Sequence, residues 1–510
     1  MTGSGWMRRV PRWLAVAAVC LMVAAPGSRN AAGAADPPRE ADGLNEIRSK
    51  NGVLTATLTA APQTVRMGDV AFPGATFNGD YAGPVLRVRP GDTMHIHLVN
   101  RLNEPTNLHF HGMQGSPLGN GDNVHVLVAP GGSFDYIIAV PETQPPGLYW
   151  YHTHPHGLSE AQVMGGLSGA LIVEGLADQF PALSGAAERV LVLKDYVAPD
   201  SDDDDDATPP PLRALHGVVQ SINGRLSVAL AARPDETQLW RLSNQSADRY
   251  LHLTLQGHRF RVLATDGAAV TGDTLTDMLD IAPAGRVEVL VDAGAPGSYD
   301  LTAVGLMTGE GSAYRRDRVL GQLVVSGAAA TPVAALAAYP PRRDLREATI
   351  TAHRTIVFSQ HNTPKAEDQR FFINGRIFDA NRTDIRVPLG AIEEWTIRND
   401  SDDMHVFHIH QVNFQVTAIN GVAQPFGGML DVARVPERGS ITIRLAFTDP
   451  RIVGRFMYHC HVLRHEDKGM MGQIQVYDPA ATGPIAWASR LLHRVRFWLA
   501  GVPWAYCSAA

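Results

Sequence analysis

Residues 388–399 read PLGAIEEWTIRN, a tight turn at Pro388-Leu389-Gly390 that leads into a strand ending in Asn399. The same arrangement recurs in residues 89–100, RPGDTMHIHLVN, and in residues 233–244, RPDETQLWRLSN. In every copy the closing Asn follows the third turn residue by nine positions (91 to 100, 235 to 244 and 390 to 399). Upstream of each copy lies an Asn-Gly pair typical of a hairpin turn, at residues 78–79, 223–224 and 374–375. Such recurrence indicates three copies of one domain.

Short strands dominate the chain between these repeats. Residues 85–89 (VLRVR) and 473–476 (QIQV) are typical of strands, and 48 Gly and 34 Pro supply turns between such segments. We therefore expect an all-β protein of three consecutive β-sandwich domains. The Ala/Pro-rich stretch of residues 327–341 is typical of a linker and supports the second boundary. The expected domains are residues 44–180, 181–330 and 342–478, followed by a C-terminal tail at residues 479–510.

Composition and the N-terminus bear on location and partners. Hydrophobic residues make up 45% and charged residues 19% of the chain, which excludes wholesale disorder and a protein with many membrane spans. The formal net charge of −7 predicts no nucleic-acid partner. Residues 1–35 place Arg8, Arg9 and Arg12 before a short apolar run and then small residues, the order of a cleaved secretory signal. The mature protein is therefore predicted to be exported, either periplasmic or secreted.

Histidines gather in four clusters. A single His-x-His pair is weak evidence for a metal site, because on a strand it merely places two imidazoles on one face. The repeats provide a stronger test, since the first and third copies are offset by 299 positions (390 − 91). This offset carries His109 and His111 onto His408 and His410. The clusters comprise His109 and His111; His152 and His154; His405, His408 and His410; and His459, Cys460 and His461 with His465 and Met470.

The same arithmetic separates these pairs from others. The second copy, at an offset of 144 (235 − 91), has Leu253 and Leu255 where the first copy has its histidines. His95 and His97 map onto positions 394 and 396 of the third copy, which are Glu and Thr. We therefore interpret His95 and His97 as ordinary strand residues, and we expect the outer domains alone to present matching metal ligands.

The ligand types favour copper over zinc. Four ligands satisfy a closed structural zinc site, whereas the clusters hold ten histidines with one thiolate and one thioether. Two His, one Cys and a weak axial Met form the ligand set of a blue-copper electron-transfer site. Cys460, His465 and Met470 follow one another at five-residue steps, and the ten-residue step from Cys460 favours Met470 over its neighbour Met471. The residues on either side of Cys460 point to the opposite side of an extended strand, where they can bind a second metal group.

The four clusters resemble the copper-binding motifs of the three-domain multicopper oxidases, the family of laccases, bilirubin oxidase and bacterial copper-efflux oxidases, from about residue 50 to residue 478. The resemblance implies cupredoxin-like Greek-key domains and four coppers per chain, with a type 1 copper in the third domain and a trinuclear cluster between the first and third domains. By motif position, type 1 copper would be held by His405, Cys460, His465 and Met470. Type 2 copper would be held by His109 and His408, and the type 3 pair by His111, His152, His154, His410, His459 and His461.

The resemblance also implies two proton-relay acids, which reduction of O2 to water requires. Asp122 is placed like the family's acid after the first motif, and Glu466, directly after His465, like a second acid of the copper-efflux branch. A turn residue and a solvated loop carboxylate are the alternative interpretations. Val406 stands where the family often has Pro, and Gln411 where Gly is common. Neither is a ligand, so the copper assignment is unaffected.

The predicted function is a copper-dependent oxidase that takes single electrons from a donor and passes them to O2. Phenols or aromatic amines lead as donors, because the 14 Met are scattered and form no Met-rich insert. Oxidation of Cu(I), Fe(II) or Mn(II) is the alternative, since residues 402–404 (Asp-Asp-Met) precede His405. A non-enzymatic copper-binding or scaffold protein would have lost several ligands, and none is missing. Apolar and Arg residues alternate in residues 485–499, so membrane contact by the tail is a further alternative, behind packing on the body or disorder.

Overall fold

The computed structural model describes residues 43–197, 218–305, 316–333, 336, 343–361, 363 and 368–481. The predicted signal at residues 1–35 and the tail segment at residues 485–499 lie outside the described residues. Within the described part of the chain, no helix has both the length and the apolar character needed to span a membrane.

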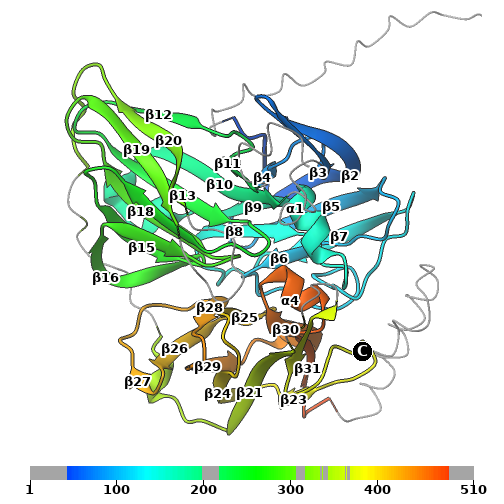
Figure 1. The fold of residues 1–510 in the computed structure, drawn as a ribbon. Coiled ribbons are helices and arrows are strands. Elements are labelled where there is room, and N and C mark those ends of the chain that lie inside the picture. The colour runs from blue at the N-terminus through cyan, green and yellow to red at the C-terminus, as the bar shows by residue number, and fades with distance from the viewer. Residues whose placement is uncertain are drawn as a thin grey trace, which may run out of the picture. The chain divides into compact units, whose positions relative to one another are not determined.

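Six sheets stack in three pairs, one pair for each repeat (Figure 1). In the first domain the sheets are β3-β2-β5-β7 and β1-β4-β9-β8-β6. In the middle and third domains the first of these sheets has two further strands at one edge, so the sheets are β11-β10-β13-β18-β15-β16 with β12-β20-β19-β14-β17, and β22-β21-β24-β29-β26-β27 with β23-β31-β30-β25-β28. The prediction of an all-β chain of three consecutive sandwich domains is confirmed, whereas the exact domain boundaries stay predictions.

The first-domain elements are β1 (Glu46–Arg48), β2 (Val53–Met67), β3 (Val70–Phe77), β4 (Gly83–Val88), β5 (Thr93–Asn100), β6 (His109–His111), β7 (Ser133–Ala139), β8 (Gly147–His152), α1 (Ser159–Gly165) and β9 (Ser168–Val173), with α2 (Leu176–Gln179) after them. The middle domain has β10 (Ala187–Val197), β11 (Val218–Ile222), β12 (Val228–Ala232), β13 (Thr237–Asn244), β14 (Leu251–Leu255), β15 (Phe260–Thr265), β16 (Ala268–Thr276), β17 (Met278–Ile281), β18 (Arg286–Asp292), β19 (Gly297–Val304) and β20 (Arg318–Val325).

The third domain has β21 (Ala352–His361), β22 (Arg370–Ile373), β23 (Ile385–Pro388), β24 (Ala391–Asn399), β25 (His405–Ile409), β26 (Phe414–Ile419), β27 (Val422–Ala423), β28 (Val432–Val435), β29 (Ser440–Phe447), β30 (Gly454–Cys460), α4 (Leu463–Asp467) and β31 (Met471–Tyr477). Figure 1 shows β6 and α1 of the first domain beside β25, β30 and α4 of the third.

The repeated Asn has a structural reason. Asn100, Asn244 and Asn399 end the inner strands β5, β13 and β24, and each side chain accepts the backbone N–H two residues on, at 2.9 to 3.1 Å. Each side-chain amide also donates to backbone carbonyls; Asn399 Nδ2, for example, reaches Asp403 O at 2.8 Å and Pro436 O at 3.0 Å. A short amide that bonds its own backbone stabilises a turn. The repeated Asn thus ties the end of one sheet to the turn that enters the strand carrying His405.

Each domain has its own apolar core, and the third domain's core extends into its neighbours. Trp395 on β24 is fully buried there together with Cys460 and Met470. Trp150 from β8 and Tyr250 from the middle domain belong to the same buried cluster. Apolar side chains therefore hold the other two domains against the face of the third domain that carries its histidines.

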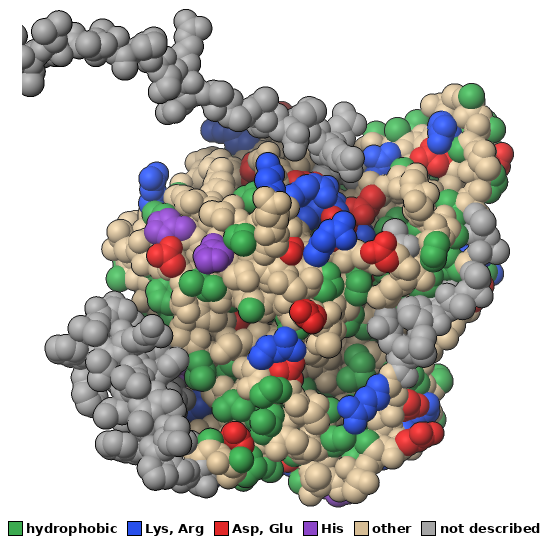
Figure 2. All heavy atoms as spheres, turned by 180° about the vertical axis from the view of Figure 1, so that it is seen from behind, with side chains coloured by type: hydrophobic (Ala, Val, Ile, Leu, Met, Phe, Trp, Pro, Cys, Tyr) green, Lys and Arg blue, Asp and Glu red, His purple; other side chains and the backbone are tan. Residues whose placement is uncertain are grey.

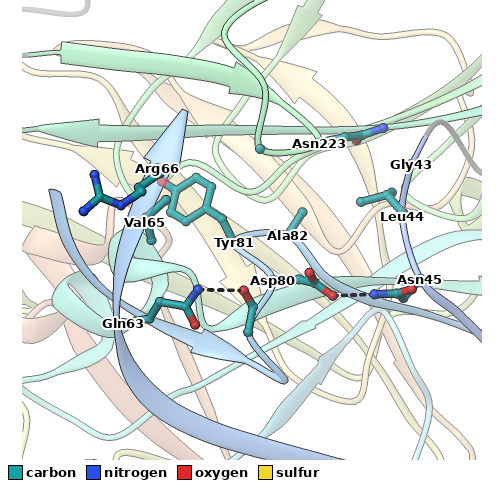
Figure 3. A pocket seen from close by; sticks show the side chains of 12 residues that line it. Gly43, Leu44, Asn45, Gln63, Val65, Arg66, Asp80, Tyr81, Ala82 and Asn223 are labelled. Carbon is teal, nitrogen blue, oxygen red and sulfur yellow. Dashed lines mark hydrogen bonds between the residues drawn. The ribbon is translucent and has the colours of Figure 1, made fainter. Parts of the chain in front are cut away.

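Cavities and charged side chains occur away from the histidines. A cavity of about 210 Å³ lies by the β2–β3 hairpin, where Asn45 Nδ2 donates to Asp80 Oδ2 at 2.6 Å and Gln63 Nε2 to Gly79 O at 3.1 Å (Figure 3). None of the twelve predicted metal ligands is among its lining residues. Figure 2 shows acidic and basic side chains interspersed with hydrophobic ones on one face of the molecule.

Candidate metal centre

The predicted histidines of the outer domains meet at one buried place. His109 on β6 pairs with His152 on β8, and His408 on β25 pairs with His459 on β30, so two similar strand pairs present their imidazoles. Three groups of imidazoles have ligand atoms within 4.8 Å of one another: His109, His408 and His410; His109, His111 and His152; and His154, His410 and His459. The His461 ring lies 4.7 Å from that of His111. The structure therefore brings together all eight histidines that sequence motifs assigned to the cluster.

In several rings one nitrogen donates a hydrogen bond, so the other nitrogen carries no hydrogen and its lone pair is free to bind a metal. His408 Nδ1 donates to Asp431 O at 2.7 Å, and His152 Nδ1 donates to Thr153 O at 2.8 Å. A carbonyl only accepts, so Nδ1 carries the hydrogen and Nε2 is unprotonated. His111 Nε2 and His152 Nε2 are buried and have no hydrogen-bond partner in the described structure.

The Nε2 atoms of neighbouring rings face one another, both between the first and third domains and within the third domain. His109 Nε2 lies 3.4 Å from His408 Nε2, and His459 Nε2 lies 3.2 Å from Nε2 of both His154 and His410. Burial lowers the pKa of His109 and His408 well below the ordinary value, so protonation does not relieve the repulsion at neutral pH. A metal cation that accepts the lone pairs would satisfy these nitrogens, and the residues therefore fit a metal centre.

A second group lies on the other side of β30. His405 Nδ1 and His465 Nδ1 are 3.0 Å apart, and Cys460 Sγ lies 3.5 and 3.7 Å from them. Burial raises the pKa of the Cys460 thiol to about 12, so the thiolate form needs a nearby cation. One thiolate with two imidazoles in a dry core fits a soft metal such as copper.

Met470 and Met471 differ in where they pack. Met470 is fully buried in the core that contains Cys460, and Cys460 N donates to Met470 O at 3.1 Å. Met471 instead packs with Val124 and Met457 in a separate cluster. The packing favours Met470 as the axial ligand, as the sequence spacing does.

Asp122 lies behind the histidine cluster. Both carboxylate oxygens are 3.1 Å from His109 Nδ1, and Phe110 N donates to Oδ1 at 3.2 Å. Burial, only partly offset by these hydrogen bonds, raises the pKa of Asp122 to about 8. Burial therefore favours the protonated form of this carboxyl group, directly beside one predicted ligand.

Gln411 holds Asp122 from the third domain. Its backbone φ is 56°, in the left-handed region where glycine is free of strain, and its Nε2 donates to Asp122 Oδ2 at 2.7 Å. The departure from the family's common Gly thus adds a hydrogen bond to the carboxyl group. At the other departure, Val406 N donates to Cys460 Sγ at 3.5 Å, a bond that proline lacks the hydrogen to make.

Glu466 lies on the other side of the cluster, on α4. Its Oε2 is 3.0 Å from His459 Nδ1, its Oε1 is 3.6 Å from His154 Nε2, and Ser159 Oγ donates to Oε1 at 2.9 Å. Burial lowers the pKa of His154 to about 4, so that ring is neutral at pH 7. Two predicted acids therefore contact the histidines from opposite sides, and neither is the solvated loop carboxylate of the alternative interpretation.

Sequence reasoning did not identify Ser159, Asp431 or Arg286. Asp431 Oδ2 accepts from His111 Nδ1 at 2.8 Å, although 320 positions separate the two residues. Arg286 Nη2 lies 2.7 Å from the other oxygen of Asp431. No local motif marks these residues, because each acts through contacts between domains.

Comparisons with known families agree with this geometry. Three models described as multicopper oxidase match residues 59–178, 189–328 and 349–480. The multicopper oxidase mco of Staphylococcus haemolyticus is 29% identical over 440 residues, which cover 84% of this chain and 90% of that protein. The cell division protein FtsP of Dickeya dadantii is 27% identical over 427 residues, covering 80% and 86%.

Two solved structures are similar throughout the three domains. The multicopper oxidase from Campylobacter jejuni, described as a metallo-oxidase, has a TM-score of 0.71 at 25% identity and covers 85% of this chain and 94% of its own. The laccase-like multicopper oxidase CueO from Ochrobactrum sp., described as active towards lignin model compounds and lignosulfonate, has a TM-score of 0.69 at 25% identity, covering 85% and 99%. The chain belongs to the multicopper oxidase family and is an oxidoreductase enzyme with the family's three-domain cupredoxin-like fold.

Proposed function

We propose that the two histidine-rich groups hold four coppers and that the enzyme passes electrons from an organic donor to O2, which is reduced to water. His405, Cys460, His465 and Met470 hold type 1 copper in this proposal. His109 and His408 hold type 2 copper, and His111, His152, His154, His410, His459 and His461 hold the type 3 pair. The observation that carries the proposal is the set of buried Nε2 atoms facing one another at 3.2 to 3.4 Å.

Cys460 joins the two sites covalently. Its sulfur faces His405 and His465, while its sequence neighbours His459 and His461 lie in the cluster. When bound, copper supplies the one-electron redox steps and the Lewis acidity that stabilises charge as O2 is reduced. The protein contributes ligand geometry, exclusion of water and a short path for electrons through the backbone of β30.

Asp122 and Glu466 supply protons in this proposal. Burial raises the pKa of Asp122, which contacts His109, to about 8. Glu466 contacts His154 and His459, and these interactions outweigh burial and lower its pKa well below the ordinary value, so it accepts a proton before passing one on. Gln411 Nε2 and Ser159 Oγ each donate to one of these acids and thereby orient it. The two acids deliver protons to opposite sides of the cluster.

The donor side is at His465, which is partly exposed while His405 is fully buried. The buried Phe371 ring stacks on the His465 ring with centroids 4.0 Å apart, so a donor would approach the part of His465 that Phe371 leaves uncovered. Asp402, which sequence reasoning considered for a metal donor, is held by Arg438 through bonds of 2.6 and 2.7 Å. We therefore place phenols or aromatic amines first among the donors; the similar Ochrobactrum enzyme is described as active towards lignin model compounds and lignosulfonate.

Oxidation of Cu(I), Fe(II) or Mn(II) is the second candidate. The Campylobacter jejuni relative is described as a metallo-oxidase, and Met404 packs beside the third-domain core, one residue before His405. A non-enzymatic copper-binding or scaffold role is disfavoured because the predicted His and Cys ligands are retained at the site. The similar protein FtsP is named for cell division. We also propose export to the periplasm or the medium, on the order of residues at positions 1–35.

The test uses one purified, copper-loaded preparation. Copper per chain is measured together with O2 uptake on a phenol, Cu(I) and Fe(II) at equal concentrations. We expect four coppers per chain and the highest rate with the phenol. His97→Ala is the matched control, because His97 is exposed and pairs with Asp135 outside the cluster. Fewer than four coppers after full reconstitution would contradict the ligand assignment, and a dominant metal-ion rate would replace the proposed donor.

A further inference from the structure

Asp431 offers acceptors to histidines of both outer domains. Its Oδ2 accepts from His111 Nδ1 at 2.8 Å, and its backbone carbonyl accepts from His408 Nδ1 at 2.7 Å. Since Nδ1 is the donor in both rings, Nε2 is the atom left free to bind metal. One residue therefore sets the tautomer and the ring orientation of one predicted ligand from each outer domain.

A residue of the middle domain holds the Asp431 carboxylate. Arg286, the first residue of β18, has no exposed side-chain surface, and its Nη2 lies 2.7 Å from Asp431 Oδ1. Its Nη1 donates to Ala284 O at 2.9 Å and lies 3.3 Å from Asp266 Oδ1, and its Nε donates to Leu148 O at 3.5 Å. A planar guanidinium bound on several edges is fixed in orientation, so Asp431 is fixed with it.

The glycine after His111 makes room for this arginine. Gly112 has a φ of 77°, and a Cβ built on it would lie 2.8 Å from Arg286 Nη2 and 2.8 Å from Tyr149 Cδ1. A side chain at position 112 would therefore displace the guanidinium or the tyrosine ring. The first His-x-His-Gly motif thus accommodates a residue of another domain.

We propose that Arg286 is a positioning residue for the histidine cluster, acting through Asp431 on His111 and His408. The middle domain carries no predicted ligand, yet it orients ligands of both neighbouring domains. This inference rests on the ligand assignment proposed above. Removing Arg286 leaves the buried Asp431 carboxylate without its cation. The carboxylate then shifts toward other partners and releases the His111 ring.

The test compares copper-loaded Arg286→Met and Arg286→Lys with wild type. We measure the type 2 electron paramagnetic resonance signal and the type 3 near-ultraviolet band, each relative to the blue type 1 absorption of the same sample. Arg286→Met is expected to weaken copper binding at the cluster by about 10- to 100-fold while the blue absorption per chain stays unchanged. Arg286→Lys keeps the charge without the planar fork and is expected to restore part of the loss.

Arg241→Met is the matched control. Arg241 is also a buried arginine of the middle domain, and it pairs with Glu188 and Glu288 rather than with a carboxylate bound to a histidine. This variant is expected to lower the unfolding temperature without changing the ratio of type 2 and type 3 signals to type 1. Equal loss of that ratio in Arg241→Met would show general destabilisation and overturn the positioning role.

A second variant keeps the proposal testable if Arg286→Met does not fold. Asp431→Asn preserves size and the backbone carbonyl that binds His408, so it is expected to reduce the type 3 band more than the type 2 signal. Wild-type signal ratios in both Arg286→Met and Asp431→Asn, or in Asp431→Asn alone if the other fails to fold, would overturn the inference. Wild-type protein that itself lacks type 2 and type 3 signals would instead contradict the ligand assignment.

Discussion

The same strand pair occurs in all three domains, yet it carries ligands in two of them. His109 faces His152 across β6 and β8, and His408 faces His459 across β25 and β30. In the middle domain the register is the same, with Leu253 facing Ala303 across β14 and β19. The scaffold is thus common to all three, and the predicted chemistry depends on which side chains each strand pair carries.

The middle domain contributes to the site from other positions instead. Arg286 on β18 reaches Asp431, and Tyr250 packs into the third-domain core next to β14. The difference teaches that a domain without predicted ligands can still contact the groups that hydrogen-bond to predicted ligands of its neighbours. The following predictions test this division, from the largest expected effect to the smallest.

Cys460→Ser tests the strand pair of the third domain and has the largest expected effect. A serine oxygen cannot replace the soft thiolate, so the blue absorption and donor oxidation are lost, with activity falling by roughly 10³-fold or more. Steady-state O2 uptake and visible absorption measure both. Met471→Leu is the control, since Met471 packs away from Cys460. Full oxidase activity in Cys460→Ser would disprove the proposed relay.

The double variant Leu253→His/Leu255→His gives the middle-domain strand the pattern of the outer domains. Both leucines are buried in the domain's own core, where they face the apolar residues Ala303 and Leu301 of β19. Burying unpartnered imidazoles costs about 2–4 kcal/mol for each residue, so the unfolding temperature falls and copper per chain stays constant. Additional copper bound by this variant would mean that the pattern alone creates a site.

Lys194 on β10 lies at the contact between the middle domain and the first, and a variant at this position tests that contact. It is buried beside α1 and β9, and its Nζ donates to Val163 O at 3.1 Å. In the middle domain Lys194 follows Leu193, which pairs with the repeated Asn244. In the third domain Ser359 holds the same place, because it follows Phe358, which pairs with Asn399. Burial lowers the pKa of Lys194 to about 7 from 10.5. Between these values the unfolded chain binds more protons, so this lysine makes the folded state more stable as pH rises and less stable as pH falls toward 7.

Lys194→Met removes this titration. Its stability relative to wild type should be greatest near pH 7 and should decrease with rising pH, with a slope of up to about 1.4 kcal/mol per pH unit. Thermal unfolding of both proteins at pH 7, 8 and 9 measures the change. Lys50→Met, at an exposed position, is the control. The difference in stability between this variant and wild type is expected to stay the same at the three pH values. A difference for Lys194→Met that does not vary with pH would contradict the lowered pKa.

Val406→Pro has the smallest expected effect. Proline removes the N–H that donates to Cys460 Sγ, so the sulfur donates more electron density and the type 1 reduction potential falls. A hydrogen bond worth about 1 kcal/mol corresponds to about 40 mV for one electron. Redox titration of the blue absorption measures the shift, and Val406→Ala keeps the N–H as control. An unchanged potential in Val406→Pro would show that this contact does not tune the site.

Much of the fold and the site could be predicted because the signals are local or repeat at fixed offsets. Asn100, Asn244 and Asn399 recur because the same sheet-to-turn corner needs a short amide in each domain. The offset of 299 positions separated His109 and His111 from His95 and His97, and His97 indeed lies exposed beside Asp135. Periodicity and repetition are properties of one strand at a time, so they are visible in the chain itself.

Sequence alone determined the three-domain β architecture, the histidine, cysteine and methionine ligand types, and the pairing of the first copy with the third. Tertiary structure alone decided which atoms face one another: Nε2 rather than Nδ1 at His408, Gln411 on Asp122, and Arg286 on Asp431. Two of these choices, Gln411 on Asp122 and Arg286 on Asp431, depend on contacts between residues of different domains, separated by 289 and 145 positions. No local pattern encodes such contacts, because they form only when the sandwiches pack and exclude water from the groups between them.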